Sequence, residues 1–354
     1  NTEPNVLLID NENNNDGNEN NSSELQLSNE QLDLLLSVLC NTIQTTSINV
    51  QPVCLLLLGC IVGSVKEKFA PYYSSFMPGI KSIMIEAIAP HLSVLRAKAM
   101  ECVGIIGEFV GDEVFASDAL EVMEILLRAI NEGEDTTYDH ILPACARIAR
   151  TLKSRFQPFL SYVMDPVLTG AGSVIQFSME EAEDGDTEGE VIVDEETGLE
   201  SAVVSLGPGI KKRVSLNTHG LQQKTLCTKM IYEYATSLKG DLGQYIIPCL
   251  EIVVNIVTDK HSSDLRFAAS HAIPALFEAA IDATRRLETL TPLHLQEIFD
   301  LSLNKLVEAI KGEINSSARE CAVESLRDII ELSYESGIEQ SNGRYINSLC
   351  GPNL

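Results

Sequence analysis

The sequence predicts an all-α protein in which helix pairs stack into a superhelix. The main observation is a segment that is rich in aromatic residues, leads to a proline and recurs along the chain. Its clearest copies are 72–80, 159–168 and 245–250. Their prolines Pro78, Pro166 and Pro248 are 88 and 82 residues apart. Each interval fits two of the forty-odd-residue helix pairs that are typical of HEAT-type repeats, so we expect an α-α superhelix (HEAT-repeat solenoid) of about six helix pairs.

A second pattern recurs in the first helix of the units, where an arginine is followed three residues later by an alanine. The copies are Arg96 and Ala99, Arg266 and Ala269, and Arg319 and Ala322. Residues three apart share one helix face, so the alanine lets a neighbouring helix approach while the arginine can reach carbonyl or carboxylate groups. The pattern is also common by chance, and it has weight because each copy occupies the same place in its unit.

Composition favours a stack over separate globular domains. Hydrophobic residues make up 45% of the 354 residues, aromatic residues only 5%, and tryptophan is absent. This length would suit two or three domains, yet no break in composition separates two cores. A stack explains this, because each unit buries its apolar face against the next one.

The first half of the chain contains a tail and the first set of repeats. Residues 1–27 are acidic and rich in asparagine, so we expect them to be disordered or loosely attached. Residues 28–171 are expected to form HEAT repeats, beginning with a helix from 28 to about 46 that Ser28 caps. The pairs that follow are expected at 52–68 and 71–89, 93–110 and 112–130, and 138–153 and 156–171.

Residues 172–216 interrupt the helical periodicity with an acidic insertion. Eleven carboxylates fall between Glu180 and Glu200 without a basic residue among them. Because like charges resist compaction, we expect a long mobile loop that protrudes from the stack. The insertion ends in the basic run 211–213 (Lys-Lys-Arg), which either folds back onto the acids as a mimic of a basic ligand or lies in solvent.

Helical pairing resumes in residues 217–354. The expected helices are 217–239 with 241–257, 262–283 with 292–311, and 316–336, which opens a further unit. A solenoid needs a polar cap at each end, and the last partner helix is barely begun. We therefore expect the repeats to be truncated at the C-terminal end and the chain to be a central piece of a longer protein.

The charge balance excludes some classes of partner. With 25 Lys and Arg against 51 Asp and Glu, the formal net charge is −26, so direct binding to nucleic acid or to an anionic membrane surface is not expected. Such a surface attracts basic partners, although acidity also serves solubility alone. No apolar run approaches the ~18 residues that span a bilayer, so no membrane insertion is expected.

The residue patterns of catalysis and metal binding are absent from the sequence. The nine cysteines include no CxxC pair, as expected of reduced, core-filling thiols, and the six histidines never fall at metal-ligand spacing. There is no HExxH motif, phosphate loop, Gly-x-Ser-x-Gly elbow or EF-hand. We expect no enzyme, no cofactor and no metal site, and the remaining function is recognition.

A curved helical stack can recognise a partner on its concave face, which second helices line in HEAT proteins. The polar candidates there are Glu86, Glu121, Glu124, Asp165, Glu251 and Asn255. The acidic-insertion candidates that could complete a groove for Lys- or Arg-rich peptides are Glu180, Glu181, Glu183, Asp184, Asp186, Glu188 and Glu190. The alternative is that each of these residues simply belongs to a solvated surface.

Several stretches of the chain resemble the importin-beta superfamily of nuclear transport receptors, in particular the importin five (karyopherin beta three) branch. They are 69–78, 95–107, 204–207, 218–221 and 265–274. No single stretch is diagnostic, but their order and spacing together are specific, and the similarity covers roughly 50–341.

The resemblance implies a receptor that shuttles between cytoplasm and nucleus with basic cargo such as localisation-signal peptides, ribosomal proteins or histones. It also implies cargo release by Ran-GTP in the full-length receptor, through amino-terminal repeats that this chain is expected to lack. The convex first helices would contact phenylalanine-glycine nucleoporins. The family's acidic insertion matches 180–200 in character, although this chain has no tryptophan near it.

A different class of function suits the same architecture. A HEAT-repeat scaffold subunit, such as one that organises a phosphatase, would hold folded subunits and need neither basic cargo nor an acidic insertion. A pull-down that recovers ribosomal proteins, histones and pore proteins indicates transport, whereas a phosphatase catalytic subunit indicates scaffolding.

Overall fold

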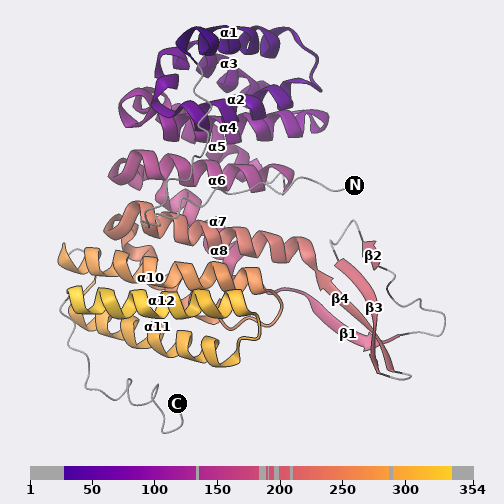
Figure 1. Cartoon of the computed structure of the whole chain (residues 1–354), viewed down its shortest axis with the longest axis vertical. Helices are drawn as coiled ribbons and strands as arrows, with labels where there is room; N and C mark the ends of the chain where they lie inside the picture. The colour runs from indigo at the N-terminus through magenta and orange to yellow at the C-terminus, as the bar shows by residue number, and fades with distance from the viewer. Residues whose placement is uncertain are drawn as a thin grey trace.

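A computed structural model of the chain describes residues 28–132, 135–182, 189, 191–194, 199–207, 210–286 and 290–336. The expectations for 1–27 and for the chain after 336 lie outside these residues. Within them, twelve α-helices stack in two layers, and a small β-sheet stands to one side of the stack (Figure 1). The predicted all-α superhelix is confirmed for this helical body.

One layer consists of the first helices of the units. They are α2 (Gln51–Val65), α4 (Ser93–Val110), α6 (Asp135–Leu152), α8 (Thr218–Leu238), α10 (Ser263–Arg285) and α12 (Ser316–Ser336). Each of these helices packs against the next one in this order. The first-helix layer is therefore continuous along the described chain.

The other layer consists of the second helices. They are α1 (Asn29–Thr45), α3 (Tyr73–Glu86), α5 (Asp112–Glu132), α7 (Leu160–Gly172), α9 (Ile246–Ile256) and α11 (Pro292–Gly312). Helix α3 packs between α1 and α5, and α9 packs between α7 and α11. The described residues thus contain five complete pairs, from α2/α3 to α10/α11, between the flanking helices α1 and α12.

Short 3-10 helices form several of the connections. They are η1 (Lys66–Tyr72), η2 (Pro90–Leu92), η3 (Lys153–Phe159) and η4 (Lys239–Tyr245). Three of them lead from a first helix into a second helix, and each of those three begins with a lysine at positive φ: 51° at Lys66, 50° at Lys153 and 48° at Lys239. The expected aromatic segments begin here, so the repeat lies in these turns as well as in the helices.

The arginine of the Arg-x-x-Ala pattern ties each first helix to the end of the preceding second helix. Arg96 Nε donates to the carbonyl of Met84 at 3.1 Å, Arg266 Nη1 to that of Asp259 at 2.9 Å, and Arg319 Nε to that of Glu313 at 3.0 Å. The paired alanines Ala99, Ala269 and Ala322 are buried. Arg96 and Arg319 thus satisfy carbonyl groups at the ends of α3 and α11, which lack an intrahelical partner, and Arg266 satisfies one in the turn after α9. Contact with carbonyl groups is the role expected from the spacing.

At α8 a lysine takes the place of the arginine. Lys224 Nζ donates to the carbonyl of Ser173, the C-cap residue of α7, at 2.7 Å. Three residues later stands the buried Cys227 in place of alanine. The contact recurs here although the residue types change, so the sequence pattern alone misses this copy.

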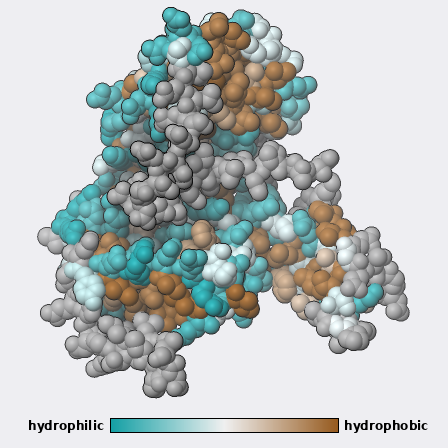
Figure 2. All heavy atoms as spheres, viewed as in Figure 1, coloured by the Kyte–Doolittle hydropathy of each residue, from teal (hydrophilic) through white to brown (hydrophobic). Residues whose placement is uncertain are grey.

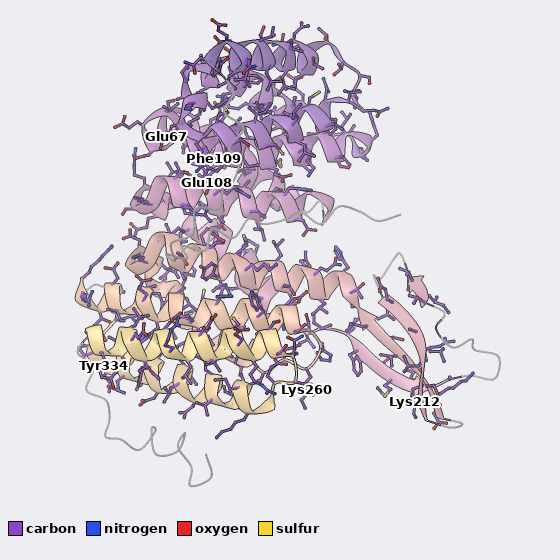
Figure 3. All side chains as sticks on the ribbon, viewed as in Figure 1. Glu67, Glu108, Phe109, Lys212, Lys260 and Tyr334 are labelled. Carbon is purple, nitrogen blue, oxygen red and sulfur yellow. The ribbon has the colours of Figure 1, made fainter. Side chains whose placement is uncertain are left out.

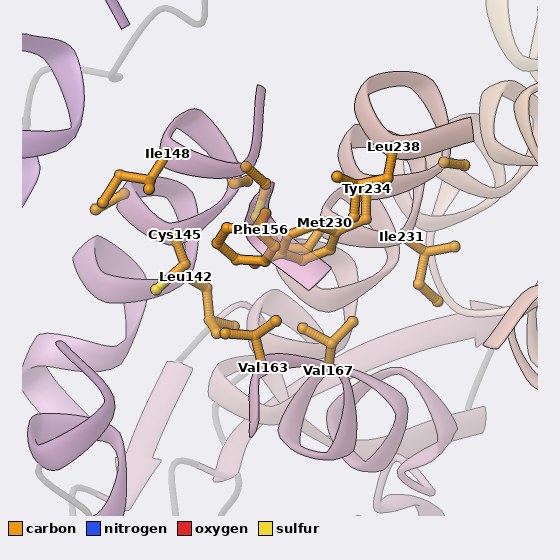
Figure 4. Packing of buried hydrophobic residues seen from close by; sticks show 14 of the residues in the cluster. Leu142, Cys145, Ile148, Phe156, Val163, Val167, Met230, Ile231, Tyr234 and Leu238 are labelled. Atoms are coloured by element: carbon orange, nitrogen blue, oxygen red, sulfur yellow. The ribbon is translucent and has the colours of Figure 1, made fainter. Parts of the chain in front are cut away.

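The core runs through both layers without interruption. Around its middle, Phe156 of η3 lies among side chains of α6, α7 and α8 (Figure 4). Its ring is 5.9 Å from that of Tyr234, and both residues are fully buried. Phe156, three residues before the aromatic segment that approaches Pro166, is therefore a core anchor between neighbouring units.

Most described cysteines fill this core as free thiols, as expected, and Cys60 is exposed. Burial raises the pKa of Cys145 and of Cys249 to about 12, so both thiols stay protonated. Among the helices that the structure describes, none is long and apolar enough to cross a membrane.

The expectation of a loop at 172–216 is wrong for the part that the structure describes. Four antiparallel strands form there: β1 (Phe177–Glu181), β2 (Val191–Asp194), β3 (Leu199–Gly207) and β4 (Ile210–Asn217), in the order β1-β4-β3-β2. Of the acidic candidates, Glu183, Asp184, Asp186, Glu188 and Glu190 lie outside the described residues.

Two features of the sequence explain the sheet, and a count of charges along the chain neglects both. Residues 191–193 are Val-Ile-Val and 203–204 are Val-Val, and β-branched residues favour strands. The basic run of β4 also pairs with the acids of β1, because Arg213 lies opposite Glu180 and Lys212 opposite Glu181. Neutralisation across this strand pair offsets part of the repulsion among the carboxylates of the segment.

Candidate functional site

The six polar candidates on second helices all lie on the second-helix layer. Glu86 is the last residue of α3, Glu121 and Glu124 lie on α5, Asp165 lies on α7, and Glu251 and Asn255 lie on α9. All six are exposed, because they stand opposite the buried stripes of their amphipathic helices. We call these residues the polar wall.

Between α3 and α5, part of the polar wall is already occupied by a cation of the chain itself. Lys81 Nζ lies 2.7 Å from Asp118 Oδ1 and 2.5 Å from Glu121 Oε2. The Tyr73 hydroxyl donates to the other Asp118 oxygen at 2.7 Å. Burial raises the pKa of Asp118, but hydrogen bonds from Lys81 and Tyr73 outweigh it and lower the pKa. A cationic ligand at Glu121 therefore competes with Lys81.

The rest of the polar wall is more open. Glu86 Oε1 accepts a hydrogen bond from the hydroxyl of Ser82 at 2.8 Å, and Asn255 Nδ2 donates to the carbonyl of Glu251 one helical turn earlier at 2.7 Å. The Glu251 carboxylate and Asp165 are exposed. These two carboxylates are the members of the wall best placed to receive a lysine or arginine side chain.

Sequence reasoning missed Tyr162, which lies on α7 one turn before Asp165 and is 61% exposed. A ring beside a carboxylate can bind the stem and charge of a lysine through packing and cation–π attraction. The signal was present in the sequence, since Tyr162 precedes Asp165 by three residues and therefore shares its helix face.

The described part of the acidic insertion stands apart from the polar wall. Glu180 and Glu181 are exposed on β1, and Lys212 Nζ lies 3.5 Å from Glu181 Oε1. Lys212 is well to the side of the helical stack (Figure 3). The expected single groove of wall and insertion is therefore not formed by β1 and β4, and the basic run belongs to the middle of the sheet instead of covering the wall.

The described residues show no metal centre. No group of three or more His, Cys, Asp or Glu side chains in this part of the chain could hold a metal ion. His271 packs at 4.6 Å from the ring of Phe267 and at 6.1 Å from that of Tyr232. It is placed as a packing residue between α8 and α10.

Comparison with known proteins relates this architecture to one family. A family model described as "Importin subunit beta-1-like, TPR repeats" matches residues 19–188. Importin subunit beta-3 of Saccharomyces cerevisiae is 27% identical over 257 residues, which are 72% of this chain and 23% of that protein. These matches support a member of the importin-beta superfamily.

Further relatives support the importin-5/Kap121 branch of that superfamily, in agreement with the resemblance seen in the sequence. A probable importin-5 homolog of Dictyostelium discoideum is 22% identical over 277 residues, 77% of this chain and 24% of that protein. The crystal structure of the karyopherin Kap121p with the extreme C-terminus of the phosphatase Cdc14p superposes with a TM-score of 0.68 at 25% identity. The match covers 85% of this chain and 27% of Kap121p. The chain spans about a quarter of the length of the curated relatives that it matches.

Proposed function

We propose that this chain is part of a nuclear import receptor and that its polar wall binds basic segments of cargo proteins for transport through the nuclear pore. Similarity to the importin-5/Kap121 branch supports transport over the scaffold alternative. Solved structures show Kap121p bound to the extreme C-terminus of Cdc14p and to Nup53p. Binding of protein segments, with no chemical step, is the activity that we assign.

The observation that carries the proposal is a set of exposed carboxylates on consecutive second helices. Asp165 on α7 and Glu251 on α9 are the clearest pair, because α7 and α9 pack side by side. An extended peptide that crosses both helices would meet one carboxylate per unit. Alternate lysine or arginine side chains could then each form a charge-assisted hydrogen bond.

The whole receptor would do more than this chain shows. In the proposed receptor, Ran-GTP releases cargo in the full-length protein and phenylalanine-glycine nucleoporins contact the first-helix layer. The protein then shuttles between cytoplasm and nucleus with localisation-signal peptides, ribosomal proteins or histones as cargo. These assignments rest on the family resemblance.

The polar wall is tested by titrating the chain with a fluorescently labelled lysine-rich signal peptide at low and at physiological salt. Glu251→Lys should weaken binding about tenfold at low salt, because it replaces attraction by repulsion. Glu320→Lys is the matched control, since Glu320 is exposed on α12 of the first-helix layer and changes charge equally. One solved form of Kap121p carries lysine in place of three acidic residues, so such charge reversals are compatible with this fold.

Two results would count against the polar wall. If the peptide fails to bind at low salt, the chain does not recognise basic segments. If Glu251→Lys and Glu320→Lys weaken binding equally, the attraction comes from net charge and not from this surface.

A further inference from the structure

The sheet ends in an unusual edge strand. In the described strand order, β2 pairs with β3 only and lies at one end. Its residues Val191, Ile192 and Val193 are 58%, 51% and 54% exposed. Proteins usually protect such an edge with lysine, proline or a bulge, because its open backbone groups can pair with another strand. Residues 191–194 (Val-Ile-Val-Asp) contain no lysine or proline.

One face of the sheet continues this apolar character from edge to edge. The strand registers align four apolar residues in a row, one from each strand: Met179, Val214, Ala202 and Val191. The next row on the same face is Phe177, Leu216, Glu200 and Val193, so it is apolar at both edges and carries one carboxylate on β3. Phe177 and Met179 are also about half exposed, and hydrophobic surface gathers on the projecting sheet (Figure 2). A strand added at β2 would extend the apolar row that ends at Val191 and would lie beside Val193 and Glu200 of the next row.

Charge indicates what kind of strand fits. From 177 to 217 the sequence carries eleven carboxylates and three basic residues, so a second acidic strand would be repelled. The sheet already pairs an acidic strand with a basic one, since Arg213 and Lys212 of β4 lie opposite Glu180 and Glu181 of β1. A second copy of this chain, with its net charge of −26, is a poor partner for the same reason.

We propose that the open edge of β2 binds an extended, basic segment of another protein by strand addition. Every second residue of the segment is β-branched and lies on the apolar face of the sheet, next to Val191 and Val193. The ends of the segment carry lysine or arginine. Backbone hydrogen bonds supply affinity and the alternating side chains supply specificity, as in other strand-addition complexes. This proposal goes beyond the polar wall and holds whether or not that wall binds cargo.

The backbone part of the proposal is tested with the peptide Lys-Arg-Val-Thr-Val-Thr-Val-Arg-Lys and the unaltered chain. Two N-methylated versions, methylated at the odd or at the even central residues, keep the side chains but lose one row of N–H donors each. Strand addition uses one row only, so one version should lose binding and the other should stay within about threefold. Equal binding of both versions would overturn the proposal.

Two chain variants locate the edge. Val193→Lys and Met179→Lys each place one positive charge at a half-exposed site on the same face, but at opposite edges of the sheet. The first should weaken binding of the unmethylated peptide about tenfold and the second much less. The bound peptide should also slow hydrogen exchange at 191–194. Equal effects of both variants, or exchange that does not change, would overturn the assignment to β2.

Two further measurements distinguish peptide binding at β2 from binding at the polar wall and from self-association of the chain. The bound peptide should leave hydrogen exchange of α7 and α9 unchanged. Slower exchange there, with no change at 191–194, would place the peptide on the polar wall and overturn the proposal. Sedimentation of the chain alone should show no dimer through β2. A dimer that Val193→Lys dissociates would show that a second copy of the chain occupies this edge and would overturn the proposal. Should Val193→Lys disturb β3, seen as faster exchange at 201–204, the two methylated peptides still decide.

Discussion

Arg266 on α10 holds the carboxylate of Glu313 with two N–H groups, Nε at 2.5 Å from Oε2 and Nη2 at 2.8 Å from Oε1. Glu313 is the C-cap residue of α11, and its own carbonyl accepts from Arg319 of α12. The hydrogen bond from Arg266 is the main cause that lowers the pKa of Glu313. One buried glutamate thus links three consecutive helices.

Glu313→Gln should destabilise this end of the stack by about 3 kcal/mol, because the charge of Arg266 loses its buried partner. Since repeats can open locally, the measurement is hydrogen exchange of α10, α11 and α12 with increasing urea. Glu308→Gln is the control: it removes an exposed ion pair with Lys305 at 3.0 Å and should cost under about 0.5 kcal/mol. Similar costs would show that the Arg266 pair contributes no more than a surface pair.

Gly104 marks a close approach of two helices in the first-helix layer. A Cβ added there would lie 2.9 Å from Ala144 Cα, so α4 and α6 touch backbone to backbone. Gly104→Ala should therefore destabilise the fold by about 1–3 kcal/mol through overpacking, despite the better helix propensity of alanine. Gly63→Ala on α2 meets only Phe109 Cε2 at 3.7 Å and should be neutral or stabilising by up to about 1 kcal/mol. Thermal unfolding compares the two variants, and equal shifts would contradict a backbone contact at Gly104.

The helical part of the fold could be predicted because its determinants are local and repeat. The spacing of Pro78, Pro166 and Pro248 placed the units, and the Arg-x-x-Ala pattern placed their first helices. The sheet could not be predicted in this way, because its pairing is long-range: Glu180 meets Arg213 from thirty-three positions away. A count of charges along the chain therefore missed that basic residues of β4 neutralise acidic residues of β1 across the strand pair.

Glu101 predicts how stability depends on pH. It lies 3.3 Å from His140 Nδ1 and 2.8 Å from Lys98 Nζ, and these contacts lower the pKa of Glu101 to about 2 although burial raises it. A depressed pKa adds stability that is complete above the unfolded value near 4.5 and is lost as the pH falls toward 2. The loss should be about 3 kcal/mol.

Glu101→Gln isolates this contribution, because the amide cannot titrate. The variant should be less stable than the parent at pH 6, and the difference should shrink between pH 4.5 and 2 in urea titrations. Glu124→Gln removes an exposed carboxylate on α5 and controls for the change of net charge. A difference between Glu101→Gln and the parent that stays constant down to pH 2 would show that Glu101 is not held in its ionised form.

The polar wall was predictable in position but not in its pairing. Helical periodicity placed Glu121, Asp165 and Glu251 on exposed faces, and the structure agrees. That Lys81 of α3 reaches Glu121 of α5 depends on how two helices forty residues apart pack. Sequence periodicity fixes a helix face but not the neighbour that faces it.

The lysine turns carry backbone strain that can be measured by substitution. Lys66 has φ 51° and ψ −127°, a conformation that costs a residue with a Cβ about 1–3 kcal/mol and that glycine adopts readily. Lys66→Gly should therefore stabilise the chain by about 1 kcal/mol, and Lys66→Val should destabilise it. Lys68→Gly, two residues later and not at positive φ, should instead cost about 0.5–1 kcal/mol because glycine gains freedom in the unfolded chain. Urea unfolding compares the free energies of unfolding of the three variants and the parent. A Lys66→Gly variant no more stable than the parent would mean that the side chain of Lys66 contributes as much as its backbone strain costs.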